Sequence, residues 1–194
     1  MPGNLRTFVA LALAPDDAAD LAAWAARALA DVRDVRPVPA ANLHATLVFC
    51  GMLPEPERAE VARLTEAEAE GVPLATLAPR RVSALGSVVA VVYEPAGDAA
   101  PLLALQSRLA ARLTAAGLAP HEDRPWLPHV TVARARRGVR PRTGRLDPPP
   151  ADISPSGVAA YTSWPMQGGV AYRPIAFIGN DADTRAQVAP DRGG

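Results

Sequence analysis

The chain has 194 residues, of which 49% are hydrophobic and 21% are charged, and its formal net charge is zero. This composition excludes a disordered chain, and the length favours one globular unit with a single core. Zero net charge also excludes long-range attraction of the whole protein to nucleic acid, so any such contact must rely on a local patch.

The first half of the chain alternates between apolar strands and helices. Residues 7–13 are an apolar run typical of a buried strand, and residues 15–17, Pro-Asp-Asp, are a helix start whose carboxylates favour the helix dipole. The residues that follow repeat apolar side chains about one turn apart. A second strand is expected over 43–49 and a charged helix over 57–70, closed by Gly71.

The second half follows a similar plan. Residues 82–93 contain a run of β-branched residues that is too hydrophobic for an exposed edge, so we place this strand centrally. An amphipathic helix is expected over 99–116, followed by a strand over 130–133 and by further strands near 157–163 and 170–178. The shared plan suggests two related lobes that face one another.

Only features that the sequence lacks bear on the cellular location and the oligomeric state. The single cysteine, Cys50, has no partner for an internal disulfide, and no window reaches the roughly 18 uninterrupted apolar residues of a membrane helix. The N-terminus enters a strand-like run without a charged leader and cleavage site. We therefore expect a cytoplasmic monomer with no membrane contact and no obligate protein partner.

Two of the three histidines occur in the same setting, His44-Ala45-Thr46 and His129-Val130-Thr131. Residues i and i+2 of a strand point to one face, so each histidine shares a surface with its threonine while Ala45 and Val130 point the other way. A lone histidine in such a strand is most often a core residue, but the repeated motif favours a functional pair. The motifs lie too far apart for a local metal-binding loop and fit two lobes that each supply one strand to a cleft.

Two histidines suit in-line displacement at phosphorus, in which one group removes a proton from the attacking oxygen and another protonates the departing oxygen. The threonine hydroxyls can donate to phosphate oxygens as charge builds there. We expect no metal and no cofactor. Three histidines without a spaced carboxylate cluster fall short of the usual ligand sets, and a chain without lysine cannot complete a Gly-x-x-x-x-Gly-Lys phosphate loop.

The segments 42–49 and 124–134 resemble the 2H phosphoesterase superfamily and, within it, the bacterial and archaeal RNA 2′,3′-cyclic phosphodiesterases, also called 2′-5′ RNA ligases. The likeness also includes the first strand and extends to the strand near 170–178. It implies an enzyme, a phosphoric diester hydrolase that opens a 2′,3′-cyclic phosphate at an RNA end without a metal. The product is a 2′-phosphomonoester, and 2′-5′ end joining is a weak reverse reaction.

The resemblance also implies residue roles. His44 is the proton donor to the leaving ribose oxygen, His129 is the acceptor that activates water, and Thr46 and Thr131 hold the phosphate. Because the histidines exchange roles when the reaction runs backward, the four residues are a firmer prediction than the two assignments.

Arg134 and Phe8 are further candidates for substrate binding. Arg134 follows His129 by five positions, an odd offset that in a regular strand turns it to the opposite face. Phe8 is a base-stacking candidate by resemblance, although a phenylalanine in an apolar strand is typical of the core. Trp126 stands where the family commonly has smaller aromatic residues and affects the entrance, whereas the small Ala45 faces away from the cleft.

All twenty basic residues are arginine, and six of them fall between Arg134 and Arg145 without an acid. A solvated loop is one interpretation, and a salt-sensitive contact with RNA phosphates next to the cleft is the other. His121 is expected on a surface loop without a role. Cys50 is expected to be a buried hydrophobic residue rather than a nucleophile.

Together, the shared plan and the resemblance predict an α+β fold. We expect two pseudo-symmetric lobes, each an antiparallel-rich sheet with helices on the outer face, whose His-x-Thr strands face a shared central cleft. A single bilobal domain is expected over residues 1–180 and a flexible tail over 181–194. The expected partners are RNA ends that carry a 2′,3′-cyclic phosphate, or small cyclic nucleotides. Two alternatives stay open, a cyclic phosphodiesterase that acts on a small nucleotide and a non-catalytic RNA-binding module of the same fold.

Overall fold

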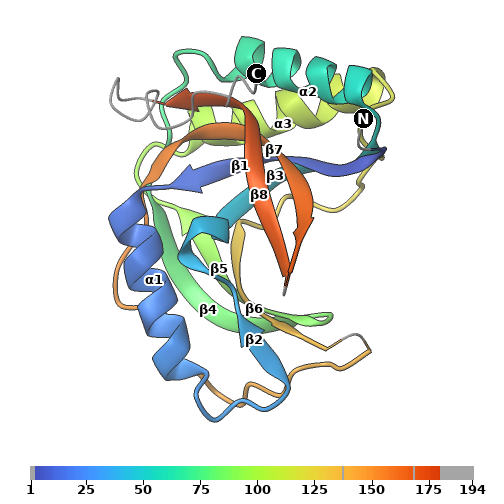
Figure 1. Cartoon of the computed structure of the whole chain (residues 1–194). Coiled ribbons are helices and arrows are strands. Elements are labelled where there is room, and N and C mark those ends of the chain that lie inside the picture. The colour runs from blue at the N-terminus through green and yellow to red at the C-terminus, as the bar shows by residue number, and fades with distance from the viewer. Residues whose placement is uncertain (1–2, 137, 168, 180–194) are drawn as a thin grey trace.

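The computed structural model describes residues 3–136, 138–167 and 169–179, and the tail expected over 181–194 lies outside them. The helices lie around a strongly curved sheet (Figure 1). The strands are β1 Leu5–Leu13, β2 Val35–Pro37, β3 His44–Leu53, β4 Leu77–Leu85, β5 Val88–Pro95, β6 His129–Ala135, β7 Pro155–Met166 and β8 Gly169–Gly179. The helices are α1 Pro15–Ala28, α2 Glu55–Ala69 and α3 Ala100–Ala115, and η1 Ala40–Asn42 is a 3₁₀ turn.

The sheet is antiparallel, with the strand order β4-β5-β6-β3-β1-β7-β8, and β2 pairs with β6 outside this path. The two motif strands, β3 and β6, are therefore neighbours in its middle. They share one residue pair, Ala45 with Val130, whereas the other neighbours in this strand order pair over five or more residues and β2 pairs with β6 over three. The sheet is thus most weakly joined where the two motifs meet.

The helices cover the sheet in two places. α2 and α3 contact each other and pack against β8, β7 and β3, whereas α1 packs near β6, β2 and η1 (Figure 1). Each helix has a proline in its first turn. The backbone N–H groups of this turn have no intrahelical acceptor, so the N–H that proline lacks does not cost the helix a hydrogen bond. α3 buries Leu102, Leu105, Leu109 and Leu113 completely, as its helical period predicts.

The structure confirms the predicted α+β class and the antiparallel sheet with outer helices. The strands form one hydrogen-bonded network, and the division into two pseudo-symmetric lobes stays a prediction.

The single strand predicted over 82–93 is wrong. The chain reverses at Gly86 and Ser87 and forms the antiparallel hairpin of β4 and β5, in which Leu85 pairs with Val88. Gly86 has φ +61°, a left-handed conformation that glycine adopts without steric cost and that two-residue hairpin turns require. The β-branched run is β5, which lies inside the sheet between β4 and β6, as its hydrophobicity predicts. The short strand β2 was not predicted.

Gly157 allows β7 to lie close to β8. It lies in the row of paired residues that crosses β1 at Ala12 and reaches His44 on β3. It pairs with Gly179 of β8 and with Ala12 of β1. A Cβ at this position would lie 2.5 Å from the Ile178 carbonyl oxygen and 2.7 Å from the Phe177 ring.

We therefore expect Gly157→Ala to lower the free energy of unfolding by about 1–3 kcal/mol, because a backbone atom must move to admit the methyl group. Urea denaturation measures this effect. Gly169→Ala is the matched control, since its Cβ would have no atom within 4 Å. Equal denaturation midpoints for the two variants would contradict the proposed close packing.

Candidate functional site

The two motifs lie side by side on β3 and β6. Ala45 and Val130 pair across the two strands and are fully buried in the core. The antiparallel register places His44 opposite Thr131 and Thr46 opposite His129, and these four side chains, all partly buried, lie on the other face of the sheet. The structure thus brings the four predicted residues together on one surface, which we call the groove face.

Both imidazole rings are held in the same way. Nδ1 of His44 donates to the carbonyl oxygen of Asn42 at 2.8 Å, and Nδ1 of His129 donates to the carbonyl oxygen of Leu127 at 2.8 Å. A carbonyl can only accept, so Nδ1 carries the proton in the neutral ring and Nε2 has the free lone pair. In both rings Nε2 is therefore the atom that can exchange a proton with a ligand.

The motif strands also carry the same irregularity. β3 has an extra residue, Leu47, where Thr46 and Val48 pair with consecutive residues of β1. β6 has an extra residue, Val132, at the same offset from its histidine. Such a β-bulge shifts the alternation of side chains by one position.

Because of the bulge in β6, Arg134 lies on the exposed side rather than in the core, although its offset from His129 is odd. Val132 and Ala133 are both fully buried, and Arg134 is exposed. Its guanidinium donates to the Tyr172 hydroxyl at 3.4 Å. A contact between Arg134 and substrate stays a prediction, but the bulge removes the geometric objection to it.

An aromatic cluster surrounds the His44 ring. Phe8 stacks on it with ring centroids 4.7 Å apart, and Tyr172 meets it edge-on at 5.1 Å. Tyr161 stacks on Phe8 with centroids 5.4 Å apart and is tilted against the His44 ring at 6.2 Å. Phe8 is only 3% exposed, so in this structure it packs against His44, and direct stacking on a base stays a prediction.

Asn42 fastens β8 to the first motif. Its side-chain amide donates to the Val170 carbonyl oxygen at 2.9 Å and accepts from the Tyr172 backbone N–H at 3.3 Å. Its own carbonyl receives the hydrogen bond from His44. Asn42, Tyr161 and Tyr172 were not predicted as site residues, since their contacts depend on where β7 and β8 lie in the sheet. Only Asn42 had a sequence signal for such a role, its position beside the first motif.

The electrostatic environment keeps His44 neutral. The pKa of His44 is lowered to about 4, mainly by burial; the positive charges of Arg134, His129 and Arg6 contribute to this lowering, and the hydrogen bond with Asn42 opposes it. Arg6 was not predicted as part of the site. A bound anion would act in the opposite direction from these charges.

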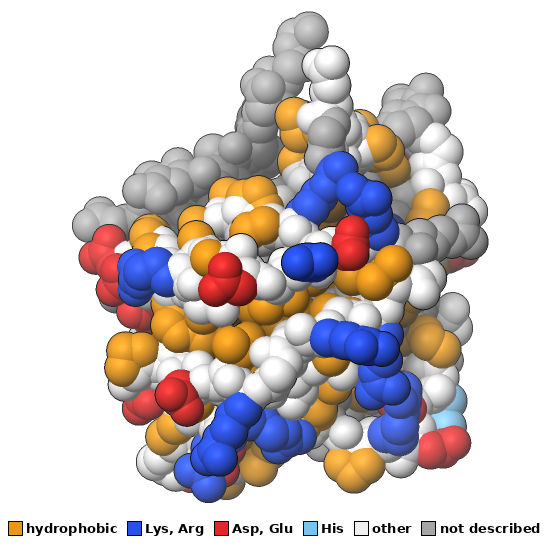
Figure 2. All heavy atoms as spheres, turned by 90° about the horizontal axis from the view of Figure 1, so that it is seen from below, with side chains coloured by type: hydrophobic (Ala, Val, Ile, Leu, Met, Phe, Trp, Pro, Cys, Tyr) orange, Lys and Arg blue, Asp and Glu red, His pale blue; other side chains and the backbone are white. Residues whose placement is uncertain are grey.

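A cavity of about 520 Å³ adjoins the His44 side of the groove face, between β2, β6 and β8. Its polar lining includes Arg36, Asn42, Arg134, Arg136 and Tyr172. In the view from below, arginine side chains lie around a band of apolar surface (Figure 2). The cavity has the charge and the size to accept part of a nucleotide.

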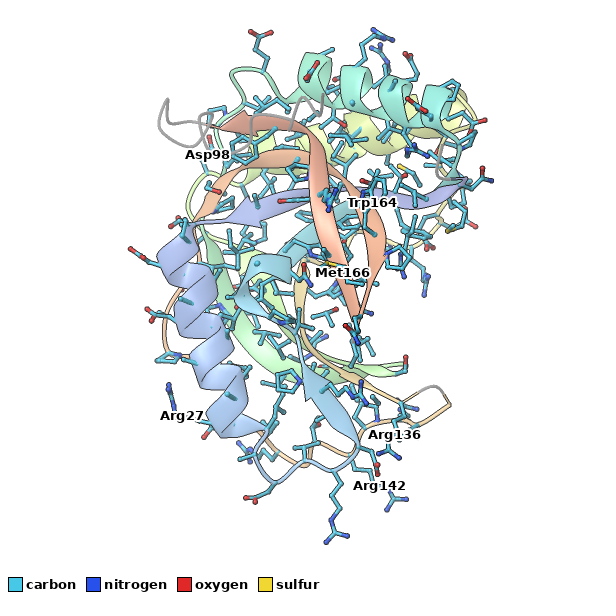
Figure 3. All side chains as sticks on the ribbon, in the orientation of Figure 1. Arg27, Asp98, Arg136, Arg142, Trp164 and Met166 are labelled. Atoms are coloured by element: carbon cyan, nitrogen blue, oxygen red, sulfur yellow. The ribbon has the colours of Figure 1, made fainter. Side chains whose placement is uncertain are left out.

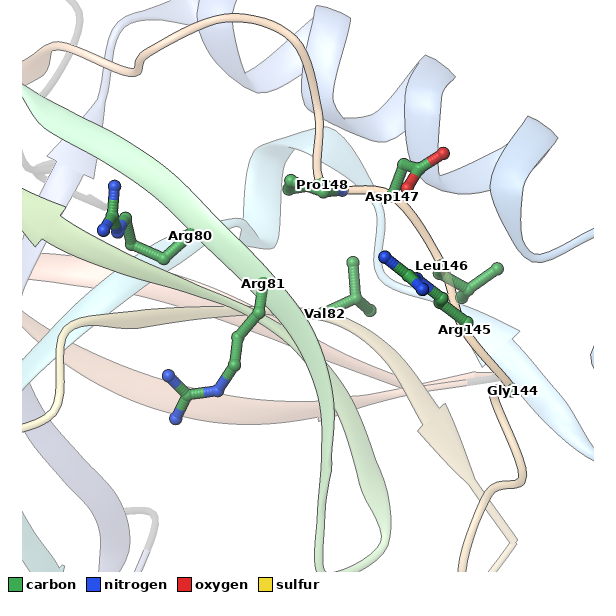
Figure 4. A pocket seen from close by; sticks show the side chains of 8 residues that line it. All are labelled: Arg80, Arg81, Val82, Gly144, Arg145, Leu146, Asp147 and Pro148. Carbon is green, nitrogen blue, oxygen red and sulfur yellow. The ribbon is translucent and has the colours of Figure 1, made fainter.

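The arginine-rich stretch divides between two places. Arg134 and Arg136 line the cavity beside His44, and Figure 3 shows Arg136 and Arg142 on the lower loops. Arg145 lines a second cavity of about 610 Å³ at the free edge of β4, together with Arg80 and Arg81 (Figure 4). Neither cavity is lined by a motif histidine, but the first is lined by Asn42 and Tyr172, which contact His44. Arg137 lies outside the described residues.

Cys50 and His121 have no part in the site. Cys50 is 5% exposed, and burial raises the pKa of its thiol to about 12, so the thiol is protonated at neutral pH. His121 is exposed and pairs with Asp123 at 2.9 Å. Among the described residues, no three His, Cys, Asp or Glu side chains are grouped to hold a metal ion. No helix within the described ranges is long and apolar enough to cross a membrane.

Trp126 supports the motif strand from the side. Its indole N–H donates to the Thr46 carbonyl oxygen at 2.8 Å, and the Gln106 amide donates to the Leu47 carbonyl oxygen at 3.3 Å. These side chains supply hydrogen-bond donors to two carbonyl groups of β3 that directly follow the one residue pair between β3 and β6. Trp126 therefore stabilises the junction of the two motif strands.

A family model described as the 2′-5′ RNA ligase superfamily matches residues 13–143 of the chain. No curated protein sequence matches it. Among solved structures, a phosphoesterase is similar with a TM-score of 0.71 and 22% identity, over 91% of this chain and 98% of its own.

Two further structures are similar. E. coli LigT complexed with 3′-AMP has a TM-score of 0.69 and 22% identity, over 91% of this chain and 98% of its own. A protein of Thermus thermophilus has a TM-score of 0.61 and 24% identity, over 90% of this chain and 97% of its own. At these identities the likeness shows the fold alone.

The pKa of His44 is a direct test of the site's electrostatics. In the ligand-free protein we expect the imidazole of His44 to titrate near 4, and Arg134→Gln to raise its pKa because a nearby positive charge is removed. Burial remains, so the pKa stays below the ordinary value of 6.5. Nitrogen-15 NMR of the imidazoles measures both the pKa and the Nδ1 proton. Arg63→Gln on α2 is the control, and a His44 pKa of 6.5 or higher in the unaltered protein would refute this environment.

Proposed function

Since the chain belongs to the 2′-5′ RNA ligase superfamily, we propose that it hydrolyses 2′,3′-cyclic phosphates at RNA ends and leaves 2′-phosphomonoesters. The observation that carries this proposal is the pair of histidines on adjacent strands, each with Nδ1 bound to a carbonyl and Nε2 free. Two such groups are what in-line displacement at phosphorus needs, one on each side of the reacting atom.

In the proposed reaction, water attacks phosphorus as its proton passes to Nε2 of His129. The bond between phosphorus and the ribose 3′ oxygen breaks, and Nε2 of His44 protonates that oxygen. The phosphate stays on the 2′ oxygen, and both protons are accounted for without a further reactant. The same sequence of steps, with a 5′-hydroxyl in place of water, is 2′-5′ end joining.

The neighbouring polar groups suit the charge that develops on the phosphate. Thr46 and Thr131 each lie beside one histidine and opposite the other, so their hydroxyls can donate to the non-bridging oxygens. Arg134 and Arg6 add positive charge near the site. Donors fixed by the strands before the substrate arrives need no rearrangement as charge builds.

The low pKa of His44 adds a condition to its role as donor. The ligand-free protein holds this ring neutral at pH 7, so it must gain a proton as the substrate binds. A phosphate anion between the rings favours the imidazolium form and offsets the effect of the arginines. Substrate binding and protonation of His44 are therefore coupled in the proposed mechanism.

RNA is the favoured substrate over a small cyclic nucleotide because the cavity lined by Asn42 and Tyr172, both in contact with His44, is also lined by Arg36 and Arg136. Arginines beyond the reacting phosphate can contact further phosphates of a chain. Structures similar to this chain include those of E. coli LigT complexed with 3′-AMP, phosphate, NADP+ and ATP, which is consistent with a nucleotide site in this fold.

The two histidines are tested by substitution. We expect His44→Ala and His129→Ala each to lower kcat/KM on an oligonucleotide with a 2′,3′-cyclic phosphate end by roughly 10²- to 10⁴-fold, the usual contribution of general acid–base catalysis. The product of the unaltered protein is a 2′-phosphate, separable from a 3′-phosphate by chromatography, and a chelator leaves the rate unchanged. His121→Ala is the matched control. Activity that survives either motif substitution with the fold intact, or that is lost with the chelator, would overturn the mechanism.

The coupling of phosphate binding to protonation has its own test. We expect inorganic phosphate to raise the NMR-measured pKa of His44 above about 4, because the anion stabilises the imidazolium form. Sodium chloride of equal ionic strength is the control and should have a smaller effect. If saturating phosphate leaves the pKa unchanged, His44 is not the donor, and the two histidine roles must be exchanged.

A further inference from the structure

β3 presents an exposed aromatic side chain that the proposed reaction does not use. Phe49 follows His44 by five residues and is 42% exposed. The bulge at Leu47 explains this exposure, since Leu47 and Val48 are both buried and Phe49 then returns to the exposed side. On β6 the bulge at Val132 brings Arg134, also five residues after its histidine, to the exposed side.

The antiparallel register places Phe49 and Arg134 at opposite ends of the groove face. Beyond Thr46, β3 runs in the direction that leads on β6 from His129 towards Leu127. Phe49 therefore belongs to the His129 end, where Leu127 is 40% exposed and its carbonyl holds the His129 ring. Arg134 belongs to the His44 end, where it contacts Tyr172.

Arg6 lies over the Phe49 ring. Its guanidinium carbon is 4.7 Å from the ring centroid, a cation–π contact. Within the described part of the chain Arg6 forms no ion pair, and its charge is among those that lower the pKa of His44. A flat ring and an arginine plane together form a surface on which nucleobases stack, with positive charge for a phosphate beside it.

We propose that Phe49 and Arg6 form a second nucleoside subsite at the His129 end of the groove. This proposal rests on the proposed function, in which the attacking oxygen approaches from the side of His129. The subsite would hold the nucleoside whose 5′-hydroxyl attacks the cyclic phosphate. In that step the 5′ oxygen bonds to phosphorus, its proton passes to His129, the bond to the 3′ oxygen breaks, and His44 protonates that oxygen.

The subsite predicts a preference for ligands with a nucleoside on both sides of the phosphate. The probe is 3′-deoxyadenylyl-(2′,5′)-adenosine, which lacks the 3′-hydroxyl and so cannot cyclise. The matched ligand is the 2′-(methyl phosphate) diester of 3′-deoxyadenosine, which has the same charge but no second nucleoside. Calorimetric titration of the full chain should show that the dinucleotide binds roughly 5- to 100-fold more tightly, the usual effect of one base stack.

Phe49→Ala should abolish this preference, and Phe49→Trp should retain it because the indole also stacks. Met52→Ala is the matched control, since Met52 lies on the same strand and is 60% exposed. Circular dichroism checks that each variant is folded.

Three results would overturn the proposal: equal binding of the two ligands by the unaltered protein, an equal loss for both ligands in Phe49→Ala, or no loss for either. The last result is the one that a protein-docking role of this surface would give. A protein that prefers the dinucleotide through Phe49 but does not hydrolyse cyclic phosphates would refute the proposed function and leave the subsite standing.

Discussion

The site depends on one hydrogen bond that occurs twice, from Nδ1 of each motif histidine to the backbone carbonyl two residues earlier. This bond fixes the tautomer and the orientation of both rings with backbone atoms that strand packing already holds in place. Because β3 and β6 are adjacent, the two free Nε2 atoms belong to one surface. The surrounding core, the aromatic cluster around His44 and the indole of Trp126 serve to keep these strands and rings in place.

The surroundings of the two histidines differ although their anchoring is the same. His44 lies against Phe8 and Tyr172, and its pKa is lowered to about 4, mainly by burial. Five residues after its histidine, β6 carries Arg134, whereas β3 carries Phe49 at the same offset. Groups of one type in unlike environments can perform opposite proton transfers. In the proposed assignment His44 is the donor, so its lowered pKa must rise when the phosphate binds.

The sequence was sufficient to predict features that depend on local periodicity. The alternation around Ala45 and Val130 predicted which face carries His44 and His129, and the helical period predicted the leucines that α3 buries. The bulge in β6 was not predictable, since nothing in its sequence marks the extra residue, and so the offset of Arg134 from His129 did not by itself predict the side of the sheet on which Arg134 lies. Contacts between distant segments, such as Asn42 with β8, depend on tertiary packing that no local pattern encodes.

The arginines beside the site have a consequence for how its activity can be measured. Arg6, Arg36, Arg134 and Arg136 supply the positive charge around the site through guanidinium groups, and burial raises the pKa of Tyr161 to about 12. Because the chain has no lysine, it also has no side-chain amine. Amine-directed labelling reagents therefore spare every side chain around the two imidazoles, so activity can be measured on protein labelled in this way.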